Sequence, residues 1–217
     1  HWKVVEWKGT VMRHILILLS ILLFSFTIIS CAKKSSTSSS STTDNTTTAY
    51  DGTYNSVCPS NEKRKYTRVF SGTNMELITK DYNEDGCSTR EGEHVSYSTF
   101  TLGHNVTVTK NSDNSSVSSQ KITITKTKHT YMFMKDDDTN SANSTSACGF
   151  SDWEINVAKD VSSVLNQSGC ATGDAIGTVD KTVILMIGSN LWMGDLSGSK
   201  DSDNFTATIK DTEMDKE

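Results

Sequence analysis

A succession of short strand-like segments follows residue 50 and limits the folds open to this chain. Each segment alternates polar and apolar residues, or is rich in β-branched and aromatic residues, which favours strands over helices. Turn sequences separate several of them, at Ser71–Asn74, Asn83–Gly86, Asn111–Ser116 and Gly188–Asn190. The ten segments are Thr53–Val57, Tyr66–Ser71, Met75–Tyr82, His94–Leu102, Val106–Lys110, Lys121–Lys128, Thr130–Lys135, Trp153–Val157, Val183–Ile187 and Leu191–Gly194.

The connections between these segments are short, which favours antiparallel hairpins over βαβ units. Eight to ten such strands predict an all-β domain over residues 50–217, folded as an antiparallel up-and-down β-barrel. A β-sandwich is the alternative. Only Lys159–Asn166 has helical spacing, so we expect at most one short helix. Asp136–Asp138 lies among Asn, Ser and Thr residues, and we expect a solvated loop there.

An apolar run over residues 15–29 precedes Cys31, and twelve of its fifteen residues are Ile, Leu or Phe. A cationic start, an apolar run of about 7 to 15 residues and small residues at the cleavage point form a secretory signal. A spanning helix needs about 20 apolar residues. We therefore expect a signal peptide over residues 12–30 and regard residues 1–11 as a non-native leader. A short uncleaved anchor is the alternative reading.

The tetrapeptide Ile28-Ile29-Ser30-Cys31 resembles the lipobox of bacterial lipoproteins, in which an aliphatic, a variable and a small residue precede a cysteine. The resemblance implies that Cys31 becomes the first residue of the mature chain and carries diacylglycerol on its sulfur. Two or more acyl chains anchor a protein stably. Ala32 is not the Asp associated with inner-membrane retention, so we expect a lipid-anchored protein of the bacterial envelope, at the outer membrane.

The segment after Cys31 has the composition of a tether. Twelve of the fourteen residues at positions 35–48 are Ser or Thr, which leaves too little apolar surface to offset the entropy of ordering. We predict a disordered tether over residues 31–49 that reaches about 20 Å as a coil.

The mature chain is acidic. The whole sequence has 21 basic and 26 acidic side chains, and removal of residues 1–30 leaves 18 basic and 25 acidic ones, a formal net charge of −7. A polyphosphate backbone repels such a protein, so we expect no nucleic-acid partner. The run Lys63–Arg68 is a local exception, and we expect it to be a solvated strand face. The sequence identifies no protein partner.

Four further cysteines follow the signal, at positions 58, 87, 148 and 170. Disulfides form and persist in exported proteins. No CxxC pair or neighbouring histidine spacing indicates zinc. Four cysteines allow three pairings, and we predict Cys58 with Cys87 and Cys148 with Cys170.

Motifs for metal binding or catalysis are incomplete. Asp81–Gly86 matches the first half of an EF-hand loop, but its twelfth position is Gly92 instead of a bidentate Glu, so we expect a hairpin turn. The histidines after Cys31, at positions 94, 104 and 129, lack metal-binding spacing, and we expect ordinary strand positions. We predict no catalytic residue, metal or cofactor, and therefore no enzyme.

Two serine-enzyme motifs also occur in part. Ser60–Lys63 and Ser197–Lys200 match SxxK, and Ser112–Asn114 and Ser202–Asn204 match SDN, but no KTG completes the set. Such matches arise by chance in a chain rich in Ser, Asp and Asn. We expect Trp153 and Trp192 to be core residues.

The run Gly52-Thr53-Tyr54 before Cys58, the run Cys148–Trp153 and the late Leu191–Asp195, which ends in Gly-Asp, resemble the uncharacterised lipocalin-like lipoproteins of bacterial envelopes. Lipocalins proper have Trp where Tyr54 stands. The resemblance implies a cavity inside a closed sheet that takes one small apolar molecule. It identifies no ligand-binding residue. The alternative function is a non-enzymatic structural or protein-interaction module of the envelope.

Replacement of the predicted lipid-carrying cysteine tests the predicted membrane location. In a bacterial host, Cys31→Ser is expected to remove the lipid and move the chain from the membrane pellet to the soluble fraction, because one thioether carries the anchor. Ser36→Ala in the tether is the control and should stay in the pellet. Intact mass and fractionation measure both effects, and a lipid mass retained in Cys31→Ser contradicts the prediction.

Overall fold

The computed structural model describes residues 48–58, 61–167, 169–209 and 214–217. Cys31, the predicted signal peptide and leader, and all of the predicted tether before residue 48 lie outside these ranges. The strands are β1 Gly52–Ser56, β2 Arg64–Ser71, β3 Asn74–Tyr82, β4 Arg90–Lys110, β5 Ser116–Phe133, β6 Lys159–Asp160, β7 Val179–Ile187, β8 Asn190–Met193, β9 Thr208–Ile209 and β10 Met214–Lys216.

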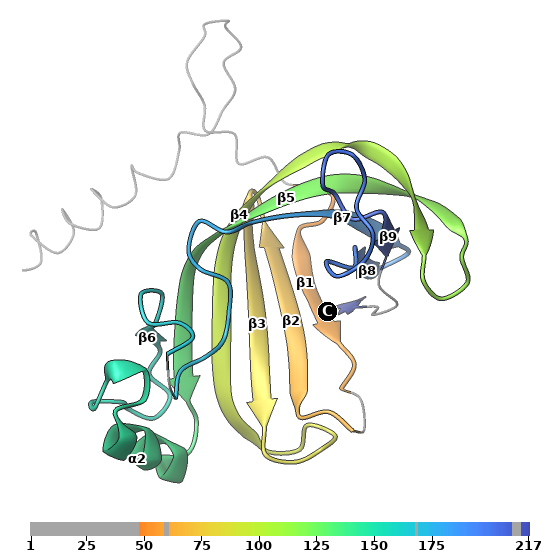
Figure 1. Cartoon of the computed structure of the whole chain (residues 1–217). Coiled ribbons are helices and arrows are strands. Elements are labelled where there is room, and N and C mark those ends of the chain that lie inside the picture. The colour runs from red at the N-terminus through yellow and green to blue at the C-terminus, as the bar shows by residue number, and fades with distance from the viewer. Residues whose placement is uncertain (1–47, 59–60, 168, 210–213) are drawn as a thin grey trace, which may run out of the picture. The chain divides into compact units, whose positions relative to one another are not determined.

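Eight of these strands close into an antiparallel β-barrel (Figure 1). The ring runs β1, β2, β3, β4, β5, β7, β8 and β10, and β10 pairs with β1. Neighbours in the ring also follow one another along the chain, apart from the inserted β6 and β9. The predicted up-and-down barrel is therefore confirmed, and the sandwich alternative is wrong.

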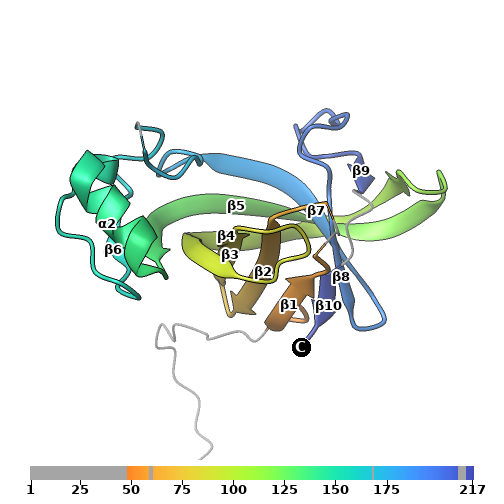
Figure 2. The same cartoon turned by 90° about the horizontal axis from the view of Figure 1, so that it is seen from below.

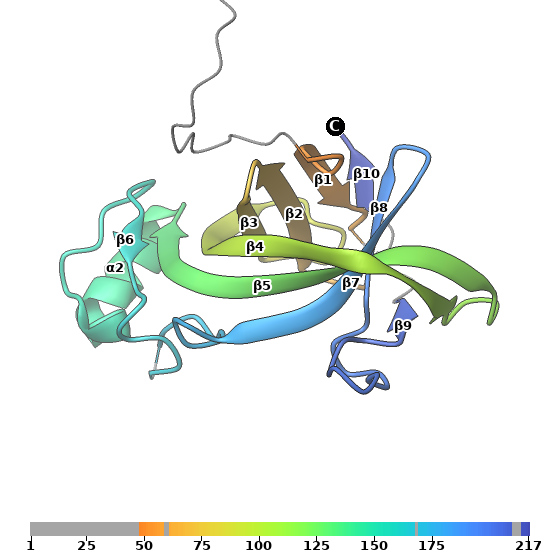
Figure 3. The same cartoon turned by 90° about the horizontal axis from the view of Figure 1, so that it is seen from above.

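The two longest strands, β4 and β5, form a hairpin that runs past the barrel (Figures 2 and 3). Each spans two of the predicted segments, because register shifts between Tyr97 and Ser98 and between Leu102 and Asn105 break the alternation without ending the pairing. The short β9 pairs in parallel with β4 near the hairpin tip. The predicted turns at Ser71–Asn74, Asn111–Ser116 and Gly188–Asn190 are confirmed.

The helix is not where the sequence predicts it. Lys159–Asn166 forms β6 and turns, whereas α2, Asp136–Thr145, replaces the expected loop. Three Asp side chains in the first turn of α2 complement the helix dipole, and Ser146 ends it in a left-handed conformation. In the described ranges, no helix is long and apolar enough to cross a membrane.

The predicted strand over Trp153–Val157 is also wrong, since this segment is a loop. Trp153 is buried under α2 and its indole N–H donates a hydrogen bond to the carbonyl of Ala147 over 3.1 Å. Val161 packs in the same cluster. The apolar spacing that suggested a helix therefore reflects burial of an irregular segment, and Trp153 is a core residue as predicted.

Both predicted disulfides are present. Cys58–Cys87 joins the segment after β1 to the connection between β3 and β4, and Cys148–Cys170 closes the segment that carries β6. Cys148 of the second bridge lies within the 3₁₀ turn η1, Ala147–Gly149. The two bridges thus fix connections at or beyond strand ends, while the strand pairing holds the barrel itself.

The strand register places alternate residues of β2 to β5 side by side on the inner face of the barrel. We number four rows of these residues from the end of the barrel near α2, which we call the mouth. Row 1 is Arg64, Asp81, Gly92 and Phe133; row 2 is Tyr66, Thr79, His94 and Tyr131; row 3 is Arg68, Leu77, Ser96 and His129; row 4 is Phe70, Met75, Ser98 and Lys126.

Apart from Ser98 and Lys126 of row 4, the side chains that pack the described interior beyond row 3 are apolar. Phe70 packs edge-on against Tyr54 and Phe100, with ring centroids 6.1 and 5.4 Å apart. Ile122 and Leu191 in the same cluster are fully buried. Close packing of this kind leaves the rows nearer the mouth as the part of the interior where a ligand has room.

Truncation of the central aromatic residue tests this packing. Phe70→Ala is expected to lower the free energy of unfolding by about 3–5 kcal/mol, because it opens a cavity between Tyr54 and Phe100. The neighbouring Val69→Ala faces away from the interior and should cost about 1 kcal/mol or less. Urea denaturation with both disulfides intact measures the two losses, and equal losses contradict the assignment of faces.

Candidate functional site

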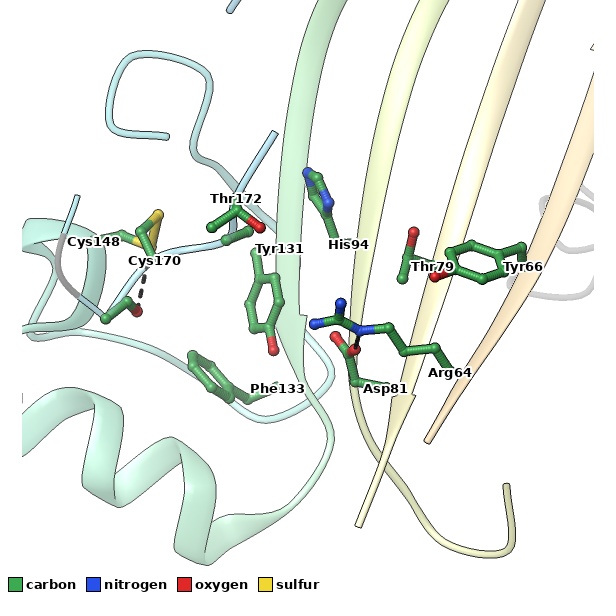
Figure 4. A pocket seen from close by; sticks show the side chains of 12 residues that line it. Arg64, Tyr66, Thr79, Asp81, His94, Tyr131, Phe133, Cys148, Cys170 and Thr172 are labelled. Carbon is green, nitrogen blue, oxygen red and sulfur yellow. Dashed lines mark hydrogen bonds and ion pairs between the residues drawn. A yellow bond between two sulfur atoms is a disulfide. The ribbon is translucent and has the colours of Figure 1, made fainter. Parts of the chain in front are cut away.

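A pocket of about 350 Å³ lies at the mouth of the barrel (Figure 4). Rows 1 and 2 supply one wall, and residues 169–173, which we call the strap, supply the other together with Cys148. The lining residues are Arg64, Tyr66, Thr79, Asp81, His94, Tyr131, Phe133, Cys148, Gly169, Cys170, Ala171 and Thr172.

The strap is held at both ends. The disulfide from Cys170 ties it to Cys148. The side-chain amide of Asn166 donates to the carbonyl of Gly173 and its oxygen accepts from the Gly173 N–H, over 2.8 and 3.1 Å. Fixed ends give this pocket a defined wall, as expected of a largely preformed site.

Arg64 and Asp81 face each other across β2 and β3 at the rim of the pocket (Figure 4). The Arg64 Nε donates to Oδ1 of Asp81 over 2.8 Å, and this hydrogen bond and the carboxylate charge raise the pKa of Arg64. The Arg64 side chain is 59% exposed, so the pair contributes little to stability. Its remaining donors are accessible to a bound molecule.

Tyr131 stands between the barrel wall and the strap, with its hydroxyl turned toward Arg64 and Asp81 (Figure 4). Burial, followed by the charges of Asp81 and Asp138, raises the pKa of Tyr131 to about 12. The hydroxyl is therefore protonated at neutral pH and is a hydrogen-bond donor. Gly92 makes room for it, because a Cβ there would lie 2.6 Å from the Tyr131 oxygen.

His94 and His129 form a stacked pair at the inner side of the pocket. His94 Nε2 and His129 Nδ1 are 3.1 Å apart, and the ring centroids are 5.2 Å apart at 21°. Burial and the neighbouring His129 lower the pKa of His94 to about 4, and burial lowers that of His129. Both rings are neutral at pH 7. Strap residue Gly173 packs against the two rings.

Several polar groups behind the pocket have no hydrogen-bond partner among the described residues. They are Nε2 of His129 and the hydroxyls of Ser96 and Ser98, in residues that are at most 6% exposed. An unpaired buried polar group costs about 1–3 kcal/mol. In row 3, burial also lowers the pKa of Arg68 to about 10. Polar side chains therefore continue from the mouth into the barrel interior, and their burial without hydrogen-bond partners lowers the stability of the fold.

The sequence motifs give no metal site. Over the described ranges, no group of three or more His, Cys, Asp or Glu side chains is arranged to hold a metal ion. The EF-hand-like run begins in β3, where Asp81 pairs with Arg64, and continues as the predicted turn. His104 is exposed on β4, away from the His94–His129 pair.

Other candidates lie elsewhere. Trp192 packs outside the barrel interior against the cluster of Val108, Val183 and Ile209, and Lys110 Nζ lies 5.0 Å from its ring. Asp203, from an SDN match, pairs with buried Lys121. Neither residue lines the mouth pocket.

The run Lys63–Arg68 is only in part the solvated strand face that the sequence predicts. Arg64, Tyr66 and Arg68 belong to the interior rows, whereas Lys65 and Thr67 lie on the opposite face of β2. Thr67 is buried there, and its hydroxyl donates to Oδ1 of Asn55 over 2.7 Å. Strict alternation within this run is the signal that could have identified the pocket-lining residues of β2.

No protein-family model matches the chain, and a search of curated proteins finds no match.

The histidine pair predicts a pH dependence of stability. Because the pKa of His94 is about 4 when folded and about 6.5 when unfolded, the unfolded chain binds more protons between these values. Stability is therefore full above about pH 6.5 and falls by on the order of 3 kcal/mol as the pH drops to about 4. Urea denaturation of His94→Gln should show a much smaller fall.

His104→Gln, an exposed position on the same strand, is the control and should keep the full dependence. If the stability of His94→Gln fell with pH as steeply as that of the unmodified chain, the histidine pair would not be the cause of the pH dependence.

Proposed function

We propose that this protein binds a small polar or amphipathic molecule in the mouth pocket, while a lipid on Cys31 holds it at a bacterial envelope membrane. The observation that carries the proposal is the pocket itself, which gathers charged, hydroxyl and aromatic side chains at the one end of the barrel where the interior rows are polar. Pockets with a few convergent polar groups among aromatic walls are typical ligand sites.

The arrangement favours binding over catalysis. Arg64 is already paired with Asp81, and His94 shares its hydrogen bond with His129, so neither is placed as an isolated acid or base. The Tyr131 hydroxyl and the free Arg64 donors suit hydrogen bonds to a polar ligand. We accordingly infer a non-enzymatic role with no cofactor.

A wholly apolar ligand, which the lipocalin-like sequence features imply, fits this interior less well. Phe70, Met75 and Phe100 are at most 3% exposed and occupy the apolar half of the barrel. The pocket walls nearer the mouth mix polar and aromatic groups. The proposed ligand therefore has a polar part that reaches rows 1 and 2.

The envelope location rests on the signal-like segment, the lipobox-like tetrapeptide and the Ser/Thr-rich run that follows it. The two disulfides are consistent with export, since such bonds persist in oxidising compartments. We place the protein at the outer membrane because Ala32 follows Cys31, with the lipid as its membrane contact.

A variant that fills the pocket tests the proposal. Thr79→Phe points a ring into the pocket, whereas Lys80→Phe, one residue later on β3, points outward. Native mass spectrometry of the full chain, purified in detergent from its host envelope, should show a stoichiometric small-molecule adduct. The adduct should persist in Lys80→Phe and disappear in Thr79→Phe.

An unmodified chain without any adduct across several growth conditions would overturn the binding function. That result would favour the alternative of a structural or protein-interaction module. An adduct retained at full stoichiometry in Thr79→Phe would place the ligand outside the mouth pocket.

A further inference from the structure

A second pocket, of about 290 Å³, adjoins the mouth pocket on the side of α2. The two share Asp81, Tyr131, Phe133 and Gly169 as lining residues. The far wall of the second pocket comes from one face of α2, at Asp138, Ser141, Ala142 and Thr145. We call this second pocket the helix pocket. Because the two pockets share walls, a ligand in one lies next to the other.

We infer that the helix pocket receives the ammonium group of a small organic cation, and that the ligand of this protein is therefore an amine. This inference rests on the proposed binding function and adds the chemical class of the ligand. Three features carry it: the balance of charge, an unpaired carboxylate oxygen and the aromatic walls.

The charge balance of the helix pocket is negative. Its lining includes three carboxylates, from Asp81, Glu91 and Asp138. Two cations offset them, since Arg64 pairs with Asp81 over 2.8 Å and Lys135 pairs with Glu91 over 3.2 Å. Asp138 has no ion pair among the described residues. One formal negative charge therefore remains for a ligand to neutralise.

Asp138 also holds the unpaired acceptor. Its Oδ2 is buried and has no hydrogen-bond partner in the described part of the chain. A carboxylate oxygen shielded from water and left without a donor is unfavourable, because burial penalises the charged form. A ligand N–H donor in the helix pocket would satisfy this oxygen.

Aromatic rings supply the other walls. Tyr131 and Phe133 pack edge to face with centroids 5.0 Å apart, and both line the pocket. A cation over such rings is attracted by their quadrupoles. The same cluster already receives a cation nearby, where Lys159 Nζ lies 5.6 Å from the Phe150 ring and 5.8 Å from the Trp153 ring.

The charges that act on the Tyr131 hydroxyl are consistent with an ammonium site in the helix pocket. After burial, the charges of Asp81 and Asp138 are the next causes that raise the pKa of its hydroxyl, and Glu91 acts in the same direction. Only Arg64 opposes them. Burial disfavours charge of either sign, but these carboxylate charges attract a cation.

An ammonium group fits these walls better than a metal ion does. Hard cations such as calcium take six to eight oxygen ligands. In the part of the chain that the structure describes, no group of three or more His, Cys, Asp or Glu side chains is arranged to hold a metal ion, and Tyr131 and Phe133 add aromatic walls. One strong acceptor beside aromatic rings matches an ammonium group with an apolar substituent.

Isothermal titration calorimetry of the full-length chain in detergent tests the inference with two probes of similar shape, benzylammonium and neutral benzyl alcohol. Benzylammonium should bind about tenfold or more tightly than the alcohol, because only the cation pairs with Asp138. This comparison needs no variant. Equal dissociation constants for the two probes would overturn the inference, as would no measurable binding of benzylammonium.

A matched pair of variants locates the effect. Asp138→Asn keeps the shape of the side chain and should weaken benzylammonium binding about tenfold or more. Asp137→Asn, one residue earlier in the same helical turn, is exposed and does not line the pocket, so its dissociation constant should equal that of the unmodified chain. Unchanged binding in Asp138→Asn would refute the role of this carboxylate.

The outcomes separate the two proposals. If the native adduct disappears in Thr79→Phe but Asp138→Asn binds benzylammonium normally, the binding function stands and the amine class is wrong. If the unmodified chain carries no native adduct, the binding function itself fails.

Discussion

Pairing of β10 with β1 closes the barrel and determines how the inward side chains are arranged. A closed antiparallel sheet has no free edges in its ring. Its register fixes which of two successive residues in a strand faces inward. Every inward side chain must then share one narrow interior. Eight strands leave space for those side chains and at most one small ligand. The identity of a few inward residues therefore decides whether a level of the barrel is packed or open.

The barrel interior has an open level at rows 1 and 2 and a packed level from row 4 onward. The same strands contribute different residue types to these two levels. On β2, Phe70 belongs to the packed level, and Tyr66 and Arg64 belong to the open one. On β4, Phe100 is in the core and His94 lines the pocket. The buried hydroxyls of Ser96 and Ser98 lie between the levels, where apolar side chains would stabilise the fold more. Polar residues kept at such positions are expected where function outweighs stability.

The elements that the sequence predicts correctly are those with local signals. Alternation and turn residues give the barrel strands, because both are properties of neighbouring residues. The helix fails for the same reason: Val161, Val164 and Leu165 have helical spacing but pack as an irregular segment against Trp153, a tertiary contact that spacing does not encode. The acidic residues at the start of α2 are typical of a helix N-terminus. The polar composition of this segment nevertheless led to the prediction of a loop.

The site is harder to predict because its residues meet through register. His94 and His129 are 35 positions apart and come together only when β4 pairs with β5. Asp138 reaches the same region from a helix that the sequence did not predict. Strand alternation alone would place Arg64 and Tyr66 on one face, but the strap that covers them depends on the Cys148–Cys170 disulfide.

Thiol accessibility distinguishes an open polar end of the barrel from a packed apolar end. Thr79→Cys and Met75→Cys place a thiol on the inner face of β3 in row 2 and row 4. Mass spectrometry follows their modification by methyl methanethiosulfonate in the folded chain. With an open mouth and a packed interior, we expect rapid modification at position 79 and modification at position 75 only as fast as the chain unfolds. Equal rates at the two positions would show that the barrel is not divided in this way.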